Sequence, residues 1–143
     1  MLKRRGIPHK PRKRRKSTRG KWTLKKADSL FSAFIRARDG KCVKCGKRPP
    51  EVQLQCSHFW ARGRKNTRYD PENCDALCAA CHYWNTDCWE NEKQGMYRDY
   101  KIEQLGIEGY NALQERARIH RKDKLAIARF IEKYPSYEQQ LSL

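Results

Sequence analysis

Two Cys-x-x-Cys motifs decide the fold of this chain: Cys42-Val43-Lys44-Cys45 and Cys78-Ala79-Ala80-Cys81. The short spacer lets both sulfurs of a motif face one ion, and four thiolates suit tetrahedral zinc. In a chain without a secretion signal, such paired motifs more often hold metal than form disulfides. We therefore predict one structural zinc ion, bound by Cys42, Cys45, Cys78 and Cys81. Because four protein ligands fill its coordination sphere, this ion would stabilise the fold rather than act in catalysis.

The segment between the two motifs is longer than a zinc ribbon requires. It has 32 residues, whereas roughly 15–20 separate the motifs of a plain ribbon. Residues 52–59 alternate between apolar and polar side chains, which predicts a β-strand with His58 on its apolar face. A second short strand is expected near Arg68 and Tyr69.

Helical spacing of apolar residues precedes and follows this segment. A helix is predicted from Leu24 to Asp39, with Thr23 as its N-cap and Gly40 as its stop. After the insert, Asp75 is expected to cap a helix that begins at Ala76.

That second helix would carry Cys78, Cys81 and His82. A last helix would cover about residues 122–134, and the helical segments before it would be separated by Gly95, Gly106 and Gly109.

Three further cysteines, Cys56, Cys74 and Cys88, lie outside the two motifs. One interpretation makes them small buried hydrophobic residues. The alternatives are that one of them replaces a zinc ligand, or that they form a second metal site together with His58.

Positive charge is concentrated at the N-terminus. The chain of 143 residues has a formal net charge of +17, and such a field attracts polyanions, above all nucleic acid. Residues 1–21 contain eleven Lys or Arg and no acidic residue. They predict a disordered arm that follows DNA phosphates; a solvated tail or an import signal is the alternative. The DNA contacts expected in the arm are Arg12, Lys13, Arg14 and Arg15.

Three polar residues accompany the zinc motifs at a recognisable spacing: His58, Asn73 and His82. Asn73 lies five positions before Cys78, and His82 directly follows Cys81. With these residues the sequence resembles the HNH endonucleases, also called ββα-metal or His-Me finger enzymes. It is similar in particular to the phage NinG (Rap) recombination nucleases, over about residues 24–118. The shared segments, in order, are Arg38-Asp39-Gly40, Ser57-His58-Phe59, Arg68-Tyr69-Asp70 and Cys78 to His82.

The resemblance implies metal-dependent hydrolysis of DNA phosphodiesters, with 5′-phosphate and 3′-hydroxyl ends. His58 would be the general base, because imidazole is neutral and basic near pH 7. Asn73 would fix the loop by hydrogen bonds. His82 would hold a catalytic Mg²⁺ or Mn²⁺ on the side of the helix that faces away from zinc. The alternative for His58 is a buried, hydrogen-bonded histidine of the strand.

One position departs from the family pattern. Many HNH enzymes have an aspartate directly before the base, whereas this chain has Ser57. A hydroxyl is a poor replacement for a carboxylate on a hard cation. The catalytic ion would then depend on His82, or on Asp70 or Asp75 if the fold brings one of them close.

The loop between His58 and the second motif is basic. We predict that it clamps the DNA backbone, with an ordinary solvated loop as the alternative; its cations are Arg62, Arg64, Lys65 and Arg68. The nearby aromatic residues are expected in the core or around the zinc rather than stacked on bases; they are Trp60, Tyr83, Trp84 and Trp89.

Together these features predict a small α+β fold: a zinc-stapled ββα-metal core with flanking helices and a disordered basic arm. We divide the chain into the arm (1–21), a nuclease domain (22–118) and a C-terminal helix and tail (119–143). The resemblance to the NinG family further implies cleavage of branched recombination intermediates, such as Holliday junctions. The rivals are a non-catalytic zinc-dependent DNA-binding protein and a structural RNA-binding protein.

The sequence also leads to expectations about the cellular location and the oligomeric state of the protein. It has no apolar stretch that could span a membrane and no secretion signal, so we expect no membrane partner and an intracellular protein. In a phage, that place would be the cytoplasm or nucleoid of the host bacterium. Symmetric cutting of a four-way junction requires two active sites and hence a homodimer, for which the sequence names no interface.

Overall fold

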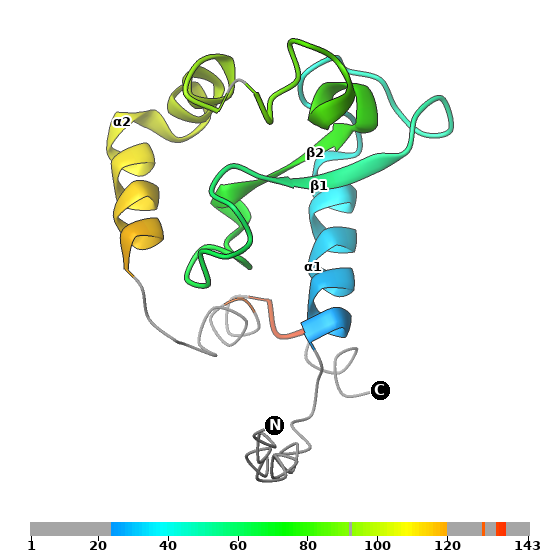
Figure 1. Cartoon of the computed structure of the whole chain (residues 1–143). Coiled ribbons are helices and arrows are strands. Elements are labelled where there is room, and N and C mark those ends of the chain that lie inside the picture. Colours follow the sequence, from blue (N-terminus) through cyan, green and yellow to red (C-terminus); the bar gives the residue numbers. More distant parts are fainter. Residues whose placement is uncertain (1–23, 92, 120–129, 131–133, 137–143) are drawn as a thin grey trace, which may run out of the picture.

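The computed structural model describes residues 24–91, 93–119, 130 and 134–136. Two strands form an antiparallel sheet in which Leu54 lies opposite Cys78 and His58 lies opposite Cys74. The fold is a small mixed α/β one, in agreement with the predicted class (Figure 1). Its elements in order are α1 (Leu24–Asp39), β1 (Leu54–His58), η1 (Pro71–Asn73), β2 (Cys74–Cys78), η2 (Ala80–Trp84) and α2 (Met96–Arg118).

Helix α1 has the predicted bounds, and its apolar stripe forms one wall of the core. Ala27, Phe31 and Ile35 are buried at helical spacing, and Gly40 ends the helix with a left-handed φ of 61°. The predicted N-cap, Thr23, lies outside the described residues.

The C-terminal end of α1 is fixed to β2 by two charged side chains. The Arg38 guanidinium donates to the carbonyl oxygens of Pro71 and Cys74, each at 2.8 Å. The Asp39 carboxylate accepts from the backbone N–H of Ala76 at 2.7 Å. These bonds set the position of the helix against the sheet.

The second strand is not where the sequence predicted it. Residues near Arg68 and Tyr69 form turns, and the expected helix from Ala76 is instead β2, with η2 beginning only at Ala80. The reason is burial: all five residues of β2 are buried, so the segment shows no alternation that would identify a strand. Asp75 has the residue type of a helix cap, but it lies inside the strand.

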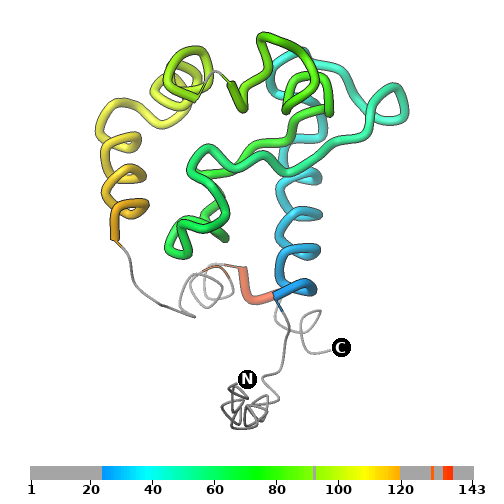
Figure 2. Tube along the Cα trace, in the orientation of Figure 1, coloured from blue at the N-terminus to red at the C-terminus, as the bar shows by residue number. Residues whose placement is uncertain are grey.

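Helices α1 and α2 lie on opposite sides of the sheet (Figures 1 and 2). The His58 ring faces α1, with its centroid 6.4 Å from that of Phe31. Asp75, at the next register position, faces α2 and accepts a hydrogen bond of 2.8 Å from the Tyr97 hydroxyl. Successive residues of a strand point to opposite faces, so the core contains the sheet between two helices.

A buried ion pair joins α2 to the sheet. The Lys101 ammonium lies 2.6 Å from the Asp75 carboxylate, and both side chains are fully buried. Lys101 also donates to the carbonyl oxygen of Glu72 at 2.7 Å. Two of the three glycines expected to separate helical segments do so: Gly95 precedes α2, and Gly106 kinks it with a φ of 71°. Gly109 lies within the helix.

None of the helices in the described part of the chain has both the length and the apolar character that crossing a membrane requires. The predicted arm (1–21) and most of the predicted last helix (122–134) lie outside the described residues.

Candidate metal centre and active site

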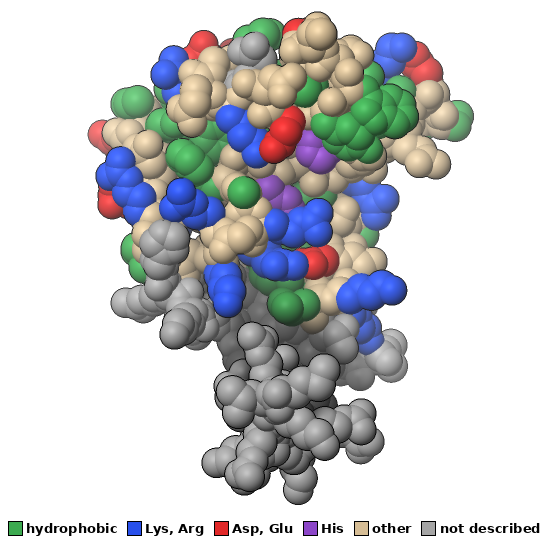
Figure 3. All heavy atoms as spheres, in the orientation of Figure 1, with side chains coloured by type: hydrophobic (Ala, Val, Ile, Leu, Met, Phe, Trp, Pro, Cys, Tyr) green, Lys and Arg blue, Asp and Glu red, His purple; other side chains and the backbone are tan. Residues whose placement is uncertain are grey.

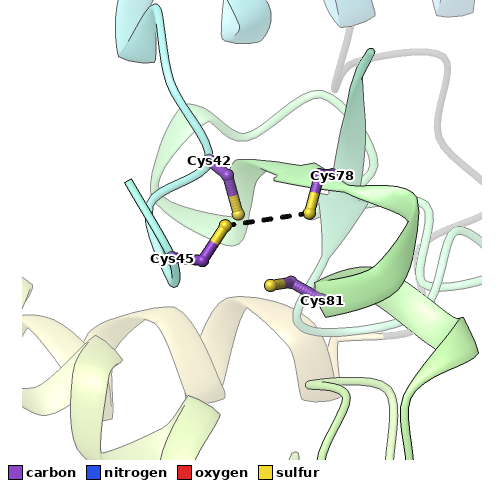
Figure 4. A group of neighbouring side chains, drawn as sticks. All are labelled: Cys42, Cys45, Cys78 and Cys81. Carbon is purple, nitrogen blue, oxygen red and sulfur yellow. Dashed lines mark hydrogen bonds between the residues drawn. The ribbon is translucent and has the colours of Figure 1, made fainter. Parts of the chain in front are cut away.

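Four cysteines gather as the two motifs predicted. Figure 4 shows their side chains pointing toward one another, from the turn after α1 and from the end of β2 and η2. All four sulfurs lie within 4.8 Å of one another, and those of Cys45 and Cys78 are 3.9 Å apart. Zinc–sulfur bonds of about 2.3 Å give a tetrahedron with edges of about 3.8 Å. The cluster of Cys42, Cys45, Cys78 and Cys81 therefore fits a zinc ion.

Backbone hydrogen bonds shape the first half of this cluster. The N–H of Gly46 donates to the Cys42 carbonyl at 2.8 Å, in a turn that requires the φ of 78° at Gly46. The N–H of Val43 donates to the carbonyl of Ala76 at 3.0 Å and so ties the turn to β2. Burial would raise the pKa of Cys42, but backbone N–H groups that donate to its sulfur lower that pKa to about 7. These hydrogen bonds favour the thiolate of Cys42, whereas burial raises the pKa of Cys45 in the same turn.

A pocket of about 590 Å³ opens between α1, β1 and η2, and both His58 and His82 line it. Figure 3 shows the histidines of the described residues on one face, with Lys and Arg side chains beside them. The structure therefore brings together the two histidines that the sequence placed in one site. Its lining also includes Asp28, Gln55, Cys56 and Arg62.

One nitrogen of His58 is occupied by the backbone. Nε2 lies 3.0 Å from the carbonyl oxygen of Arg68. A carbonyl only accepts, so Nε2 carries the proton and Nδ1 keeps a free lone pair. Burial, aided by the nearby charges of Arg62 and Arg68, lowers the pKa of His58 to about 4. The imidazole is therefore neutral at pH 7, and it is half-buried at the pocket rather than sealed in the core.

The side chain of Arg68, predicted to contact phosphate, is paired with Asp28 of α1. Its Nε and Nη2 donate to the two carboxylate oxygens at 2.9 and 2.5 Å, and the Tyr69 hydroxyl donates to the same carboxylate at 2.8 Å. Burial raises the pKa of Asp28, but these hydrogen bonds outweigh it and lower the pKa below its ordinary value. The pair holds the Arg68 carbonyl against His58.

Asn73 is fully buried and closes the loop that follows His58. Its Oδ1 accepts from the N–H of Trp60 at 2.7 Å. Its Nδ2 donates to the carbonyl oxygens of Trp60 and Thr67, each at 2.9 Å. These bonds hold both ends of the loop against the start of β2.

His82 also has one nitrogen occupied. Its Nδ1 lies 2.8 Å from Oε1 of Gln55, and the Gln55 amide nitrogen donates to the Tyr83 hydroxyl at 3.1 Å. Nδ1 is thus the donor, and Nε2 is free to bind a metal ion. Burial lowers the pKa of His82 below its ordinary value, which favours the neutral ligand. Gln55 was not predicted as a site residue, because its only signal in the sequence is its place on the strand of His58.

The carboxylates named as alternative ligands do not reach the pocket. Asp75 is paired with Lys101 in the core, and Asp70 caps η1 and forms an ion pair with Arg116. Ser57 is fully buried opposite Asp75, on the face that α2 covers. Of the residues that the structure describes, only Asp28 brings a carboxylate to the pocket lining.

The remaining loop cations differ in their surroundings. Arg62 lines the pocket and makes no ion pair or hydrogen bond within the described ranges. Lys65 is exposed, whereas Arg64 donates to the carbonyl oxygen of Ala117 at 3.2 Å. Arg62 and Lys65 are therefore the loop cations whose charge is open to a ligand.

The expectation that the aromatic residues pack in the core is correct for Trp89 and wrong for two others. Trp89 is buried and stacks on Tyr97, with ring centroids 4.4 Å apart. Trp84 and Tyr83 are 71% and 47% exposed, because η2 ends at Trp84 and none of the elements that the structure describes covers its outer side.

Comparison with known proteins assigns the chain to a family. The family described as Bacteriophage Lambda NinG protein matches residues 3–142. No curated protein and no solved structure matches the chain. The match spans nearly the whole sequence and suggests a role related to phage recombination. The chain belongs to the NinG family.

Proposed function

We propose that this protein is a metal-dependent DNA endonuclease of the HNH type that acts on branched recombination intermediates. One observation carries the proposal: His58 and His82 line one pocket, and each has one nitrogen occupied by a protein acceptor and the other free. A general base and a metal ligand both need such a fixed, neutral imidazole. The order of β1, β2 and η2 around the cysteine cluster also supports a ββα-metal core.

In the proposed reaction, Nδ1 of His58 takes a proton from a water molecule. The water oxygen forms a bond to phosphorus while the bond from phosphorus to the 3′ oxygen breaks. The 3′ oxygen takes a proton from solvent, which leaves a 3′-hydroxyl and a 5′-phosphate. The Arg68 carbonyl stabilises the imidazolium that forms and holds the ring in one tautomer.

His82 would hold Mg²⁺ or Mn²⁺ through Nε2, with Gln55 fixing its ring. Such an ion supplies Lewis-acid stabilisation of the charge on the phosphate. The cysteine cluster does not suit this task, because four thiolates leave zinc no open position. Arg62 and Lys65 would contact phosphates beside the pocket, and the arm would add contacts that do not depend on sequence.

A non-catalytic zinc-dependent DNA-binding protein is the second candidate. It is favoured by the pairing of Asp28, the carboxylate of the pocket lining, with Arg68 and Tyr69. A hard cation would then have few anionic protein ligands. In this case His58 would be structural and the basic surface would bind DNA without cutting it.

Cleavage of a labelled four-way junction, beside a linear duplex of the same sequence, separates the two candidates. With Mg²⁺ or Mn²⁺ the zinc-loaded protein should cut the junction, and His58→Ala should bind it without cutting. Binding of both DNAs without cleavage by the unmodified protein would establish the second candidate. Equal cutting of both DNAs would refute the preference for branches.

A further inference from the structure

A second group of side chains that could hold a metal ion lies at the other end of the hairpin from the cysteine cluster. Cys56 and His58 are two residues apart on β1, and Cys74 is the register partner of His58 on β2. Because side chains alternate along a strand, all three point to the face of α1. One ligand atom from each lies within 4.8 Å of the other two.

The three side chains differ in how deeply they are buried. Cys74 is fully buried, but Cys56 is half-buried and lines the same pocket as His58. A metal ion can therefore reach these side chains from the pocket. One coordination position of the ion would stay open toward the pocket. Cys88, by contrast, is buried and belongs to neither cluster of the described residues.

The hydrogen bond of His58 fits a metal ligand as well as a base. Metal-binding histidines almost always donate their other N–H to a carboxylate or a backbone carbonyl, and His58 Nε2 lies 3.0 Å from the Arg68 carbonyl. The lone pair that would bind the metal is the one that would accept a proton from water. Metal binding and base catalysis therefore exclude each other at this ring.

We propose that Cys56, His58 and Cys74 bind a thiophilic divalent cation of the zinc class, and that this ion blocks the general base. Two sulfurs and one imidazole prefer zinc-class ions to Mg²⁺, so the catalytic cation does not compete for the site. Three protein ligands bind more weakly than the four of the structural cluster. The site thus makes cleavage sensitive to free zinc; this inhibitory part rests on the proposed function, whereas the binding part does not.

Cobalt binding tests the site without reference to activity. Co²⁺ binds more weakly than Zn²⁺ and leaves the structural zinc in place, and Co²⁺–thiolate absorption reports coordination by sulfur. Full-length protein with one zinc should take up one Co²⁺ with these bands, and so should the matched control Cys88→Ala. Cys56→Ala and Cys74→Ala should lose them. Retention of the bands in folded Cys56→Ala would overturn the proposal.

Zinc inhibition tests the consequence for catalysis. In Mg²⁺-driven cleavage, added Zn²⁺ should inhibit the unmodified protein and Cys88→Ala alike. Cys56→Ala should keep its zinc-free rate and need at least about tenfold more zinc for half-inhibition, since even an outer partner of a ligand is worth roughly 10–100-fold in affinity. Equal inhibition of all three would place the effect of zinc elsewhere and refute the proposal. Co²⁺ binding without any cleavage would support the site while refuting the proposed nuclease.

Discussion

The two ends of the β1–β2 hairpin carry similar side chains in opposite settings. At one end, Cys78 closes β2 and joins a set of four sulfurs that fills a tetrahedron. At the other end, Cys74 begins β2 and lies buried beside Cys56 and His58, which line an open pocket. The difference teaches that ligand number and access, rather than cysteine content, separate a structural site from a reactive one.

The closed end depends on chain segments that are far apart in sequence, whereas the open end is built within the hairpin. Removing a ligand should therefore damage the fold at the first end and the chemistry at the second. Substitutions at the two ends test this contrast.

The largest effect is expected for Cys78→Ser. The variant should lose zinc and unfold, because the two motifs come from distant segments and metal binding is coupled to folding in small domains. Native mass spectrometry and thermal unfolding measure the two losses. Cys88→Ala, which removes a buried sulfur outside both clusters, should keep its zinc and melt near the unmodified protein. An unchanged melting temperature in Cys78→Ser would remove the contrast.

His58→Ala should leave the fold intact and lower the cleavage rate by about 10²–10⁴, the usual contribution of a general base. Single-turnover cleavage and DNA affinity, measured on the same preparation, separate chemistry from binding. Full activity in the folded variant would exclude His58 as the base.

Gln55→Ala should have a smaller effect than His58→Ala at the same pocket. Without the acceptor on Nδ1, the His82 ring can take the wrong tautomer, and loss of such a partner costs roughly 10–100-fold in metal affinity or activity. The Mg²⁺ concentration for half-maximal cleavage should rise while the rate at saturating Mg²⁺ changes little. If that concentration stays constant, Gln55 does not position His82.

The smallest effect concerns pH. Because the pKa of His58 is about 4 in the folded protein, the neutral base is fully present from pH 8 to pH 6, and the saturated cleavage rate should stay flat. A histidine with an ordinary pKa near 6.5 would lose roughly three quarters of its neutral form by pH 6.

The same pKa predicts an acid-sensitive fold. The unfolded chain binds the proton at a pKa near 6.5 and the folded one at about 4, so stability is complete above pH 6.5 and falls as the pH drops through this window. Denaturant unfolding of His58→Gln should show less loss between pH 6.5 and pH 4. Equal losses in the two proteins would contradict the lowered pKa.

Local sequence patterns predicted those parts of the fold that depend on residues close together in the chain. The apolar spacing of α1 gave its bounds, and the two Cys-x-x-Cys motifs gave the four clustered cysteines. The alternation of residues 52–59 gave β1, but its burial differs from the expectation, since Ser57 is fully buried. Both faces of the sheet are covered, by α1 and α2, and alternation in sequence does not reveal the second cover.

Ion pairs between residues far apart in the sequence account for the features that local patterns did not predict. Asp75 is acceptable inside a buried strand because Lys101 neutralises it, and no pattern near either residue predicts the pair. The partnership of Arg68 with Asp28 likewise joins positions 40 apart. In the sequence, each of these four residues looks like an ordinary charged residue of the protein surface.

The contacts that hold the loop after β1 have a consequence for synthesis of the chain. The proposed catalytic residues are all present once His82 has been made. The loop, however, is held by Arg116, which pairs with Asp70 and Glu72, and by the carbonyl of Ile119, which accepts from Asn66 at 2.8 Å. A nascent chain therefore carries every proposed catalytic group well before it carries the residues that hold this loop in place. Cutting activity should appear on the ribosome only after α2 has emerged.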